Sequence, residues 1–209
     1  TASDSLLVFW LTDSTPLSGQ YRISVVAFDN AGNQRTTTRT FIYDQDSPVR
    51  QTLTVGSKTI TPTDTVVTSA SPVSAVTAIF SETGAGISFD SVNIRLFDPS
   101  NNPVPGTLSN NSINSATFTL SNSLATSGGA DGLYKVDITA GDKAGNRMSE
   151  ETTTILYDVT PPAVLKILRN GADELTENRA VSANVDSFVV QLADTFSQVD
   201  VPASSVTLY

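Results

Sequence analysis

The sequence lacks the side chains on which most enzyme chemistry relies. Among its 209 residues there is no cysteine and no histidine. The lack of cysteine excludes disulfides, thiolate catalysis and cysteine-type zinc sites. The lack of histidine removes the group best suited to proton transfer near neutral pH, together with Ser-His-Asp and Cys-His arrangements. Paired carboxylates remain open in principle, but the Asp and Glu residues are few and scattered, which favours a protein without catalytic activity.

Long apolar runs and positive charge are also scarce. No stretch approaches the roughly 20 apolar residues of a membrane helix, and no signal-peptide pattern opens the chain, which we therefore expect to be processed or internal to a longer protein. Lys and Arg number 12 against 21 Asp and Glu, giving a net charge of −9 and a pI near 4.3. This balance disfavours nucleic acid and anionic membranes as partners and favours divalent cations.

A repeat of domain length dominates what the sequence does contain. Segments 19–33 and 132–146 share Gly-x-Tyr at the start and Ala-x-Asp-x-Ala-Gly-Asn at the end, with Tyr21 and Tyr134 separated by 113 residues. Downstream, Tyr43-Asp44 recurs as Tyr157-Asp158 at a spacing of 114 residues. This period is too long for a solenoid unit and suits a whole small domain.

The phase of the repeat predicts the domain boundaries. Pro48 and Pro161-Pro162 follow the two Tyr-Asp pairs. We therefore expect residues 1–46 to be the closing part of one domain, 47–160 a complete domain and 161–209 the opening part of a third. Within that third part, segment 205–208 resembles segment 91–94, and Asp194 stands where Glu82 stands in the complete domain.

Alternating apolar and polar residues predict β-strands throughout. Tyr134, Val136, Ile138 and Ala140 point one way, as do their counterparts in the first copy, and no helical stripe is present. Expected strands also cover 6–11, 51–55, 65–70, 74–80, 92–97, 116–120 and 152–157. Gly-x-Tyr at the head of the penultimate strand is typical of a tyrosine corner. The residues expected in the core are Val76, Phe80, Ile94, Leu96, Phe118, Tyr134, Val136 and Ile138.

These motifs resemble the bacterial immunoglobulin-like (Big-type) domain families. The segments that carry the resemblance are Ile79-Phe-Ser-Glu82, 92–99, Val104-Pro-Gly-Thr107, Gly132-Leu-Tyr134, 140–146 and 157–162. The resemblance implies an all-β fold of tandem immunoglobulin-like β-sandwich domains, each a Greek key of two antiparallel sheets. It further implies a large secreted or cell-surface, adhesin-like protein in which such domains serve as spacers and sometimes as ligand-binding tips.

The repeated Asp-x-Ala-Gly-Asn loop supports two interpretations. As a hairpin turn, its Asp bonds nearby backbone amides, while its Gly and Asn accept a positive φ. As part of a metal site, it brings Asp142 to the end where the chain enters the domain, near Asp44 and Asp46 of the linker and Glu82 of another loop. Calcium takes six to eight oxygen ligands. An inter-domain calcium ion is therefore the one cofactor that the sequence suggests.

Three functional hypotheses remain open at this stage. The first is a non-catalytic structural spacer of an extracellular or cell-surface protein, with neighbouring Ig-like domains of the same or adjacent chains as partners. The second is a module that binds a surface glycan or a protein through loops 81–88 or 101–106; Trp10, the only Trp, could stack on sugars, although a core or inter-domain role is favoured. The third is a subunit of a self-assembling filament or surface layer in which half-domains complete each other between chains.

Overall fold

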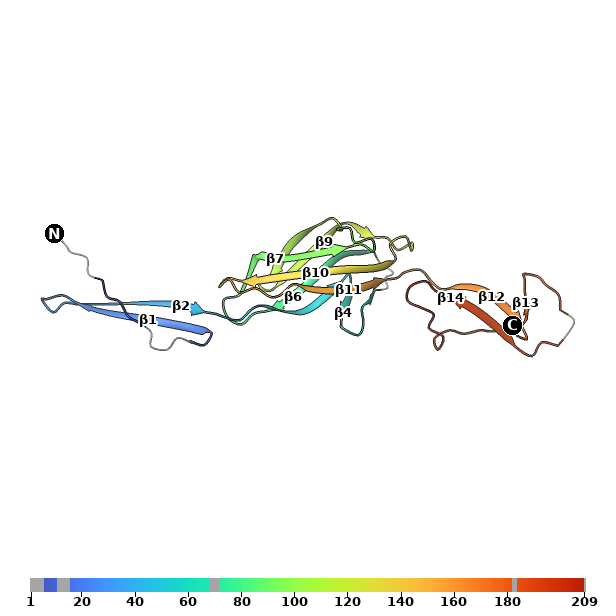
Figure 1. Ribbon diagram of the computed structural model, residues 1–209, viewed down its shortest axis with the longest axis horizontal. Coiled ribbons are helices and arrows are strands. Elements are labelled where there is room, and N and C mark those ends of the chain that lie inside the picture. The colour runs from blue at the N-terminus through green and yellow to red at the C-terminus, as the bar shows by residue number, and fades with distance from the viewer. Residues whose placement is uncertain (1–5, 11–15, 68–71, 182–183, 209) are drawn as a thin grey trace.

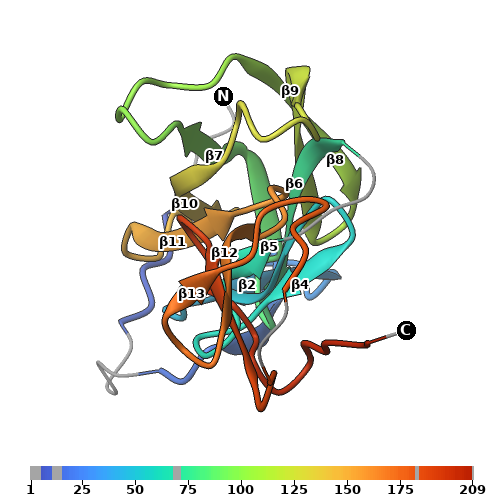
Figure 2. The same cartoon turned by 90° about the vertical axis from the view of Figure 1, so that its right-hand side faces the viewer.

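The computed structural model describes residues 6–10, 16–67, 72–181 and 184–208. Three all-β parts follow one another along the long axis: a hairpin, a two-layer sandwich and a small three-stranded sheet (Figure 1). Viewed along that axis, the three parts lie behind one another (Figure 2). Within the described ranges there is no helix, and so none long and apolar enough to cross a membrane.

The first part is a long antiparallel hairpin. Strands β1 (Gly19–Phe28) and β2 (Gln34–Tyr43) pair without interruption from Gly19↔Tyr43 to Phe28↔Gln34. Gly32 adopts a positive φ of 85° in the connecting turn, a conformation that costs glycine little because it has no Cβ. Residues 6–10, expected as a strand, are not in one, and Phe9 and Trp10 are exposed. The core or inter-domain role expected for Trp10 is therefore not seen.

The middle part is a sandwich of two sheets. One sheet has the strand order β5-β11-β10-β7 and the other β4-β3-β6-β9-β8. Neighbouring strands are antiparallel except for the edge pair β11–β5, which is parallel. The bounds are β3 (Val49–Val55), β4 (Lys58–Ile60), β5 (Val66–Val67), β6 (Val73–Ser81), β7 (Ile87–Phe97), β8 (Gly106–Ser112), β9 (Ser115–Leu124), β10 (Gly132–Asp142) and β11 (Glu151–Tyr157).

The core lies between these sheets and contains every residue that alternation predicted. The eight expected side chains are all buried, with exposed fractions from 0% to 8%. The tyrosine corner is confirmed in both copies, since the Tyr134 hydroxyl donates to the Ala130 carbonyl at 2.8 Å and the Tyr21 hydroxyl to the Leu17 carbonyl at 2.7 Å. Strands β4 and β8 were not predicted, because short or polar edge strands carry little alternation of hydrophobicity.

The third part repeats the opening strands of the sandwich. It consists of β12 (Ala163–Arg169), β13 (Asp173–Glu174) and β14 (Phe188–Ala193), in the order β13-β12-β14. The β12–β14 register matches that of β3–β6 pair for pair, including a bulge between Val164 and Lys166 where β3 has one between Arg50 and Thr52.

Residues 205–208, which resemble the β7 segment 91–94, form no strand. In the sandwich, Asn93 and Ile94 pair with β10. The described residues contain no such strand beside β12–β14, so this segment lacks a backbone partner. The same reason applies to residues 6–10. Their counterpart in the repeat is residues 116–120 of β9, which pairs with β6 and β8.

Candidate metal site at the domain junction

The turn between β10 and β11 fixes Asp142 by local hydrogen bonds. Backbone N–H groups of Gly145 and Asn146 donate to Asp142 Oδ1 at 2.7 and 2.9 Å, and Asn146 Nδ2 donates to Oδ2 at 2.8 Å. Gly145 has the positive φ expected for it, 100°, but Asn146 and its counterpart Asn33 do not have a positive φ. The Asn residues contribute side-chain hydrogen bonds to the Asp instead.

The linker after β2 supplies Asp44, which is buried although it lies between strands. Its Oδ2 accepts a hydrogen bond from the Ala85 N–H at 2.8 Å, and its Oδ1 accepts one from the Asp46 N–H at 3.1 Å. The backbone carbonyl of Asp44 accepts a hydrogen bond from Asn146 Nδ2 at 3.0 Å. One linker residue therefore binds two loops of the sandwich that follows it.

The loop after β6 supplies Glu82 and makes room for Asp44. The N–H groups of Gly84 and Gly86 donate to the two Glu82 oxygens at 2.6 and 3.2 Å. A Cβ placed on Gly84 would lie 2.3 Å from Asp44 Oδ2, closer than side-chain atoms tolerate. Gly84 is therefore required for the approach of the linker, a role that sequence reasoning did not detect because glycine is common in loops for other reasons.

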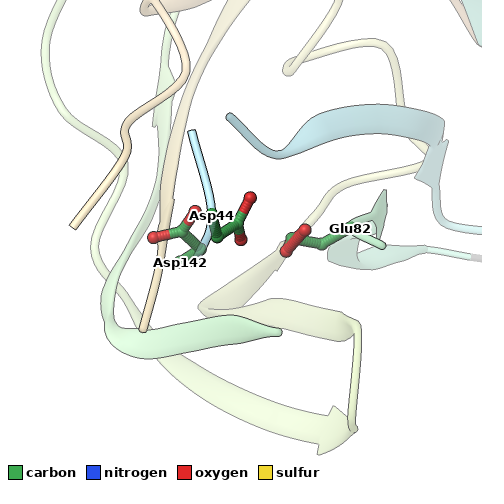
Figure 3. A group of neighbouring side chains, drawn as sticks. All are labelled: Asp44, Glu82 and Asp142. Atoms are coloured by element: carbon green, nitrogen blue, oxygen red, sulfur yellow. The ribbon is translucent and has the colours of Figure 1, made fainter. Parts of the chain in front are cut away.

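Three of the four carboxylates expected at this end do come together. Oxygen atoms of Asp44, Glu82 and Asp142 lie within 4.8 Å of one another (Figure 3). Asp46 is exposed and lies outside this group. Its backbone N–H caps the Asp44 side chain rather than its carboxylate joining the cluster.

The cluster concentrates negative charge without a paired cation from the protein. Among the described residues, no Lys or Arg forms an ion pair with these three carboxylates. Two unit charges this close repel by on the order of 3 kcal/mol at an effective dielectric constant of about 20. Burial raises the pKa of Asp142, but hydrogen bonds from the side chain and backbone of Asn146 and the backbone of Gly145 outweigh it, so that the pKa lies below its ordinary value. Asp142 is therefore ionised at neutral pH.

The hydrogen bonding of the junction recurs at the other end of the sandwich. Asp158, the counterpart of Asp44, is buried, and it accepts hydrogen bonds from the N–H groups of Ser197 at 2.9 Å and Thr160 at 3.2 Å. Asp194, the counterpart of Glu82, accepts N–H bonds from Phe196 and Gln198, each at 3.0 Å. The repeated geometry shows that the Asp of each Tyr-Asp pair accepts a hydrogen bond from a loop of the next part.

The preceding part also holds each linker. Ser18 Oγ accepts a hydrogen bond from the Gln45 N–H at 3.1 Å, and at the equivalent position Asp131 Oδ1 accepts one from the Val159 N–H at 3.1 Å. Sequence reasoning missed this pair, because a serine and an aspartate do not align as an obvious motif. Each linker is therefore bonded on both sides.

Comparison with known families identifies the fold unit. A family described as "Bacterial Ig-like domain" matches residues 7–45 and 50–159. The chain belongs to this family. A second family, "Bacterial Ig-like domain (group 3)", matches residues 116–209, so Ig-like domains stand in tandem. No curated protein matches the chain. Bacterial Ig-like domains are typical of surface and secreted proteins and are generally non-catalytic, in agreement with the residues that the sequence lacks.

Proposed function

We propose that this chain is part of a non-catalytic stalk of an extracellular or cell-surface protein, in which Ig-like domains hold one another at fixed orientations. The observation that carries the proposal is the pair of bonded linkers. Residues 44–48 and 158–162 join strands of successive parts, and in both the buried Asp accepts hydrogen bonds from a loop of the next part. A free linker would leave such backbone groups to water.

A stalk transmits force and spaces a tip from a surface, which requires stiff junctions rather than a catalytic cleft. The extended arrangement of the three parts suits that role (Figure 1). No observation on the described loops 81–88 and 101–106 favours a glycan or protein ligand there. Inter-domain interfaces are small and mobile by default, so specific linker contacts are the feature that distinguishes a stiff junction.

The stiffness can be measured by electron paramagnetic resonance distances. The chain has no cysteine, so single cysteines placed at the exposed positions Thr38 and Ser109 accept spin labels without background. We expect a narrow distance distribution that Asp44→Ala broadens. Asp98→Ala is the matched control, because Asp98 caps a similar turn by accepting N–H bonds from Ser100 and Asn102 away from the linker. A broad distribution in the unsubstituted chain would contradict the stalk.

We further propose that calcium occupies the cluster of Asp44, Glu82 and Asp142. Carboxylates from the linker, from the loop after β6 and from the β10–β11 turn converge there, and hard divalent cations prefer oxygen ligands. Water molecules would complete the coordination. Such an ion would offset the repulsion of the three charges and join the linker to the sandwich, which adds to the stiffness that the hydrogen bonds supply.

Calorimetry on the chelator-treated chain tests the ion separately from the linker. We expect heat of binding for one calcium ion and a higher melting temperature; ligand at about 100 times its Kd adds about 2.7 kcal/mol of stability. Glu82→Gln should abolish both effects and Asp98→Asn neither. No heat and an unchanged melting temperature at millimolar calcium would overturn the metal site, while the narrow distance distribution in chelator would still support the stalk.

A further inference from the structure

The two strands of the sandwich that adjoin its linkers lie in different sheets. Strand β3 begins directly after the entry linker, in the sheet β4-β3-β6-β9-β8, and β11 ends directly before the exit linker, in the sheet β5-β11-β10-β7. The linkers lie at opposite ends of the sandwich (Figure 1). Tension along the chain therefore pulls β3 and β11 in opposite directions.

This tension acts along the strands rather than across them. The strands of the sandwich run roughly along its long axis (Figure 1), and the hydrogen bonds of an antiparallel ladder are perpendicular to the strands. A pull along β3 or β11 therefore loads all the bonds of a ladder together. Among the described strands, however, no ladder joins β3 to β11, so other contacts must prevent the two sheets from sliding past each other.

At the entry end, an ion pair joins β3 directly to β11. The guanidinium of Arg50, the second residue of β3, donates to the carboxylate of Glu151, the first residue of β11. The Arg50 side chain is 16% exposed and the Glu151 side chain 38%, so water and salt screen this pair less than an ion pair on the open surface. Sliding of the sheets under tension would separate the two charges.

At the exit end, β5 joins the entry half of the sandwich to β11. It follows β3 and β4 in the chain but belongs to the other sheet, where it pairs in parallel with β11. The Leu156 N–H donates to the Thr65 carbonyl at 3.0 Å. The Asp158 N–H donates to the Val67 carbonyl at 3.1 Å. The last of these bonds lies directly at the exit linker, where tension enters β11.

We propose that the Arg50–Glu151 ion pair and the β5–β11 ladder form a mechanical lock, which holds the entry and exit strands of the sandwich together under tension. The ion pair carries load first, because residues 56–65 separate β5 from β3 and transmit tension only after β3 has detached from β6. The ladder then holds β11. The inference rests on the proposed stalk, in which such tension arises, but the lock itself belongs to the sandwich alone.

Force spectroscopy on the whole chain tests the lock. Ser47→Cys and Pro161→Cys attach the handles at exposed positions of a chain with no other cysteine, so that load enters the sandwich without passing through either junction. Unfolding rates are measured at constant force and, without load, by rapid mixing with denaturant. Glu151→Gln weakens the ion pair between the sheets. Glu150→Gln is the matched control, because Glu150 pairs at 3.1 Å with Arg95 of β7, in the same sheet as β11.

The ratio of the two variants' unfolding rates should depend on load. We expect the unfolding rate of Glu151→Gln relative to Glu150→Gln to be at least about fivefold higher under load than without it. The Glu151→Gln chain should also show an early extension of at most about 60 Å, the extended length of residues 49–64, as β3 detaches while β5 still holds. Equal ratios with and without load, or the same early extension in the chain with both glutamates at the same force, would overturn the lock. Broad spin-label distances beside a load-dependent ratio would refute the stiff stalk and leave the lock standing.

Discussion

The β1–β2 and β10–β11 hairpins share a register, a tyrosine corner and an Asp-x-Ala-Gly-Asn turn, yet their inner faces have different environments. In β10–β11 the inner residues Tyr134, Val136 and Ile138 are buried by the second sheet, while the same positions of β1–β2 meet solvent. Local geometry is therefore a property of the segment, since backbone pairing and turn hydrogen bonds form within it. Burial depends on the sheet that packs against it.

A charged residue in the inner face should give the largest difference in stability between variants of the two hairpins. Ile138→Asp places an unpaired carboxylate in a site of 0% exposure and should cost the sandwich at least about 4 kcal/mol. Val25→Asp, at the equivalent position of β1, should leave the melting temperature of the sandwich unchanged. Thermal denaturation followed by circular dichroism measures both variants. Similar losses in the two would mean that the hairpins share one cooperative unit.

Removing one hydroxyl should give an intermediate effect. Tyr134→Phe deletes the hydrogen bond to the Ala130 carbonyl and should destabilise the sandwich by about 1 kcal/mol, or a few degrees in melting temperature. Tyr21→Phe deletes the equivalent bond to Leu17 and should not change the sandwich transition. Scanning calorimetry compares them. If Tyr134→Phe melts like the unsubstituted chain, the corner contributes geometry but no net stability.

The smallest effect concerns acid stability in calcium-free buffer. The pKa of Asp142 is lowered in the folded chain, so its stabilising contribution is complete above the unfolded value of about 3.9 and is lost as pH falls through the folded pKa. Asp142→Asn should flatten the stability profile below about pH 4.

Asp29 has a pKa lowered by the side-chain hydrogen bond from Asn33, but it lies outside the sandwich. Asp29→Asn should therefore leave the acid transition of the sandwich unchanged. Chemical denaturation at several pH values measures both variants. A profile that Asp142→Asn does not alter would show that the turn holds its geometry without the ionised carboxylate.

Much of the candidate site follows from the sequence because a sandwich brings particular loops to one end. The β10–β11 turn, the loop after β6 and the entry linker converge as the sandwich topology predicts, so Asp44, Glu82 and Asp142 meet. Asp46 does not join them, since the chain turns at Asp44 and uses the Asp46 N–H as a cap. Neither feature is encoded in periodicity: the Asp44–Asp46 hydrogen bond forms within an irregular linker, and the space left by Gly84 arises from a contact between segments distant in sequence.

The sequence by itself determined the repeat, β1, most strands of the sandwich, the tyrosine corners and the core residues, because these depend on alternation and on contacts within a few residues. Tertiary structure decided which copies of those strands are buried, since burial requires a facing sheet. It also decided that segments 6–10 and 205–208 form no strand, because a strand needs a neighbour to accept its backbone hydrogen bonds. The same alternating pattern is therefore buried in β10–β11 and exposed in β1–β2, because within the described residues a second sheet packs only against β10–β11.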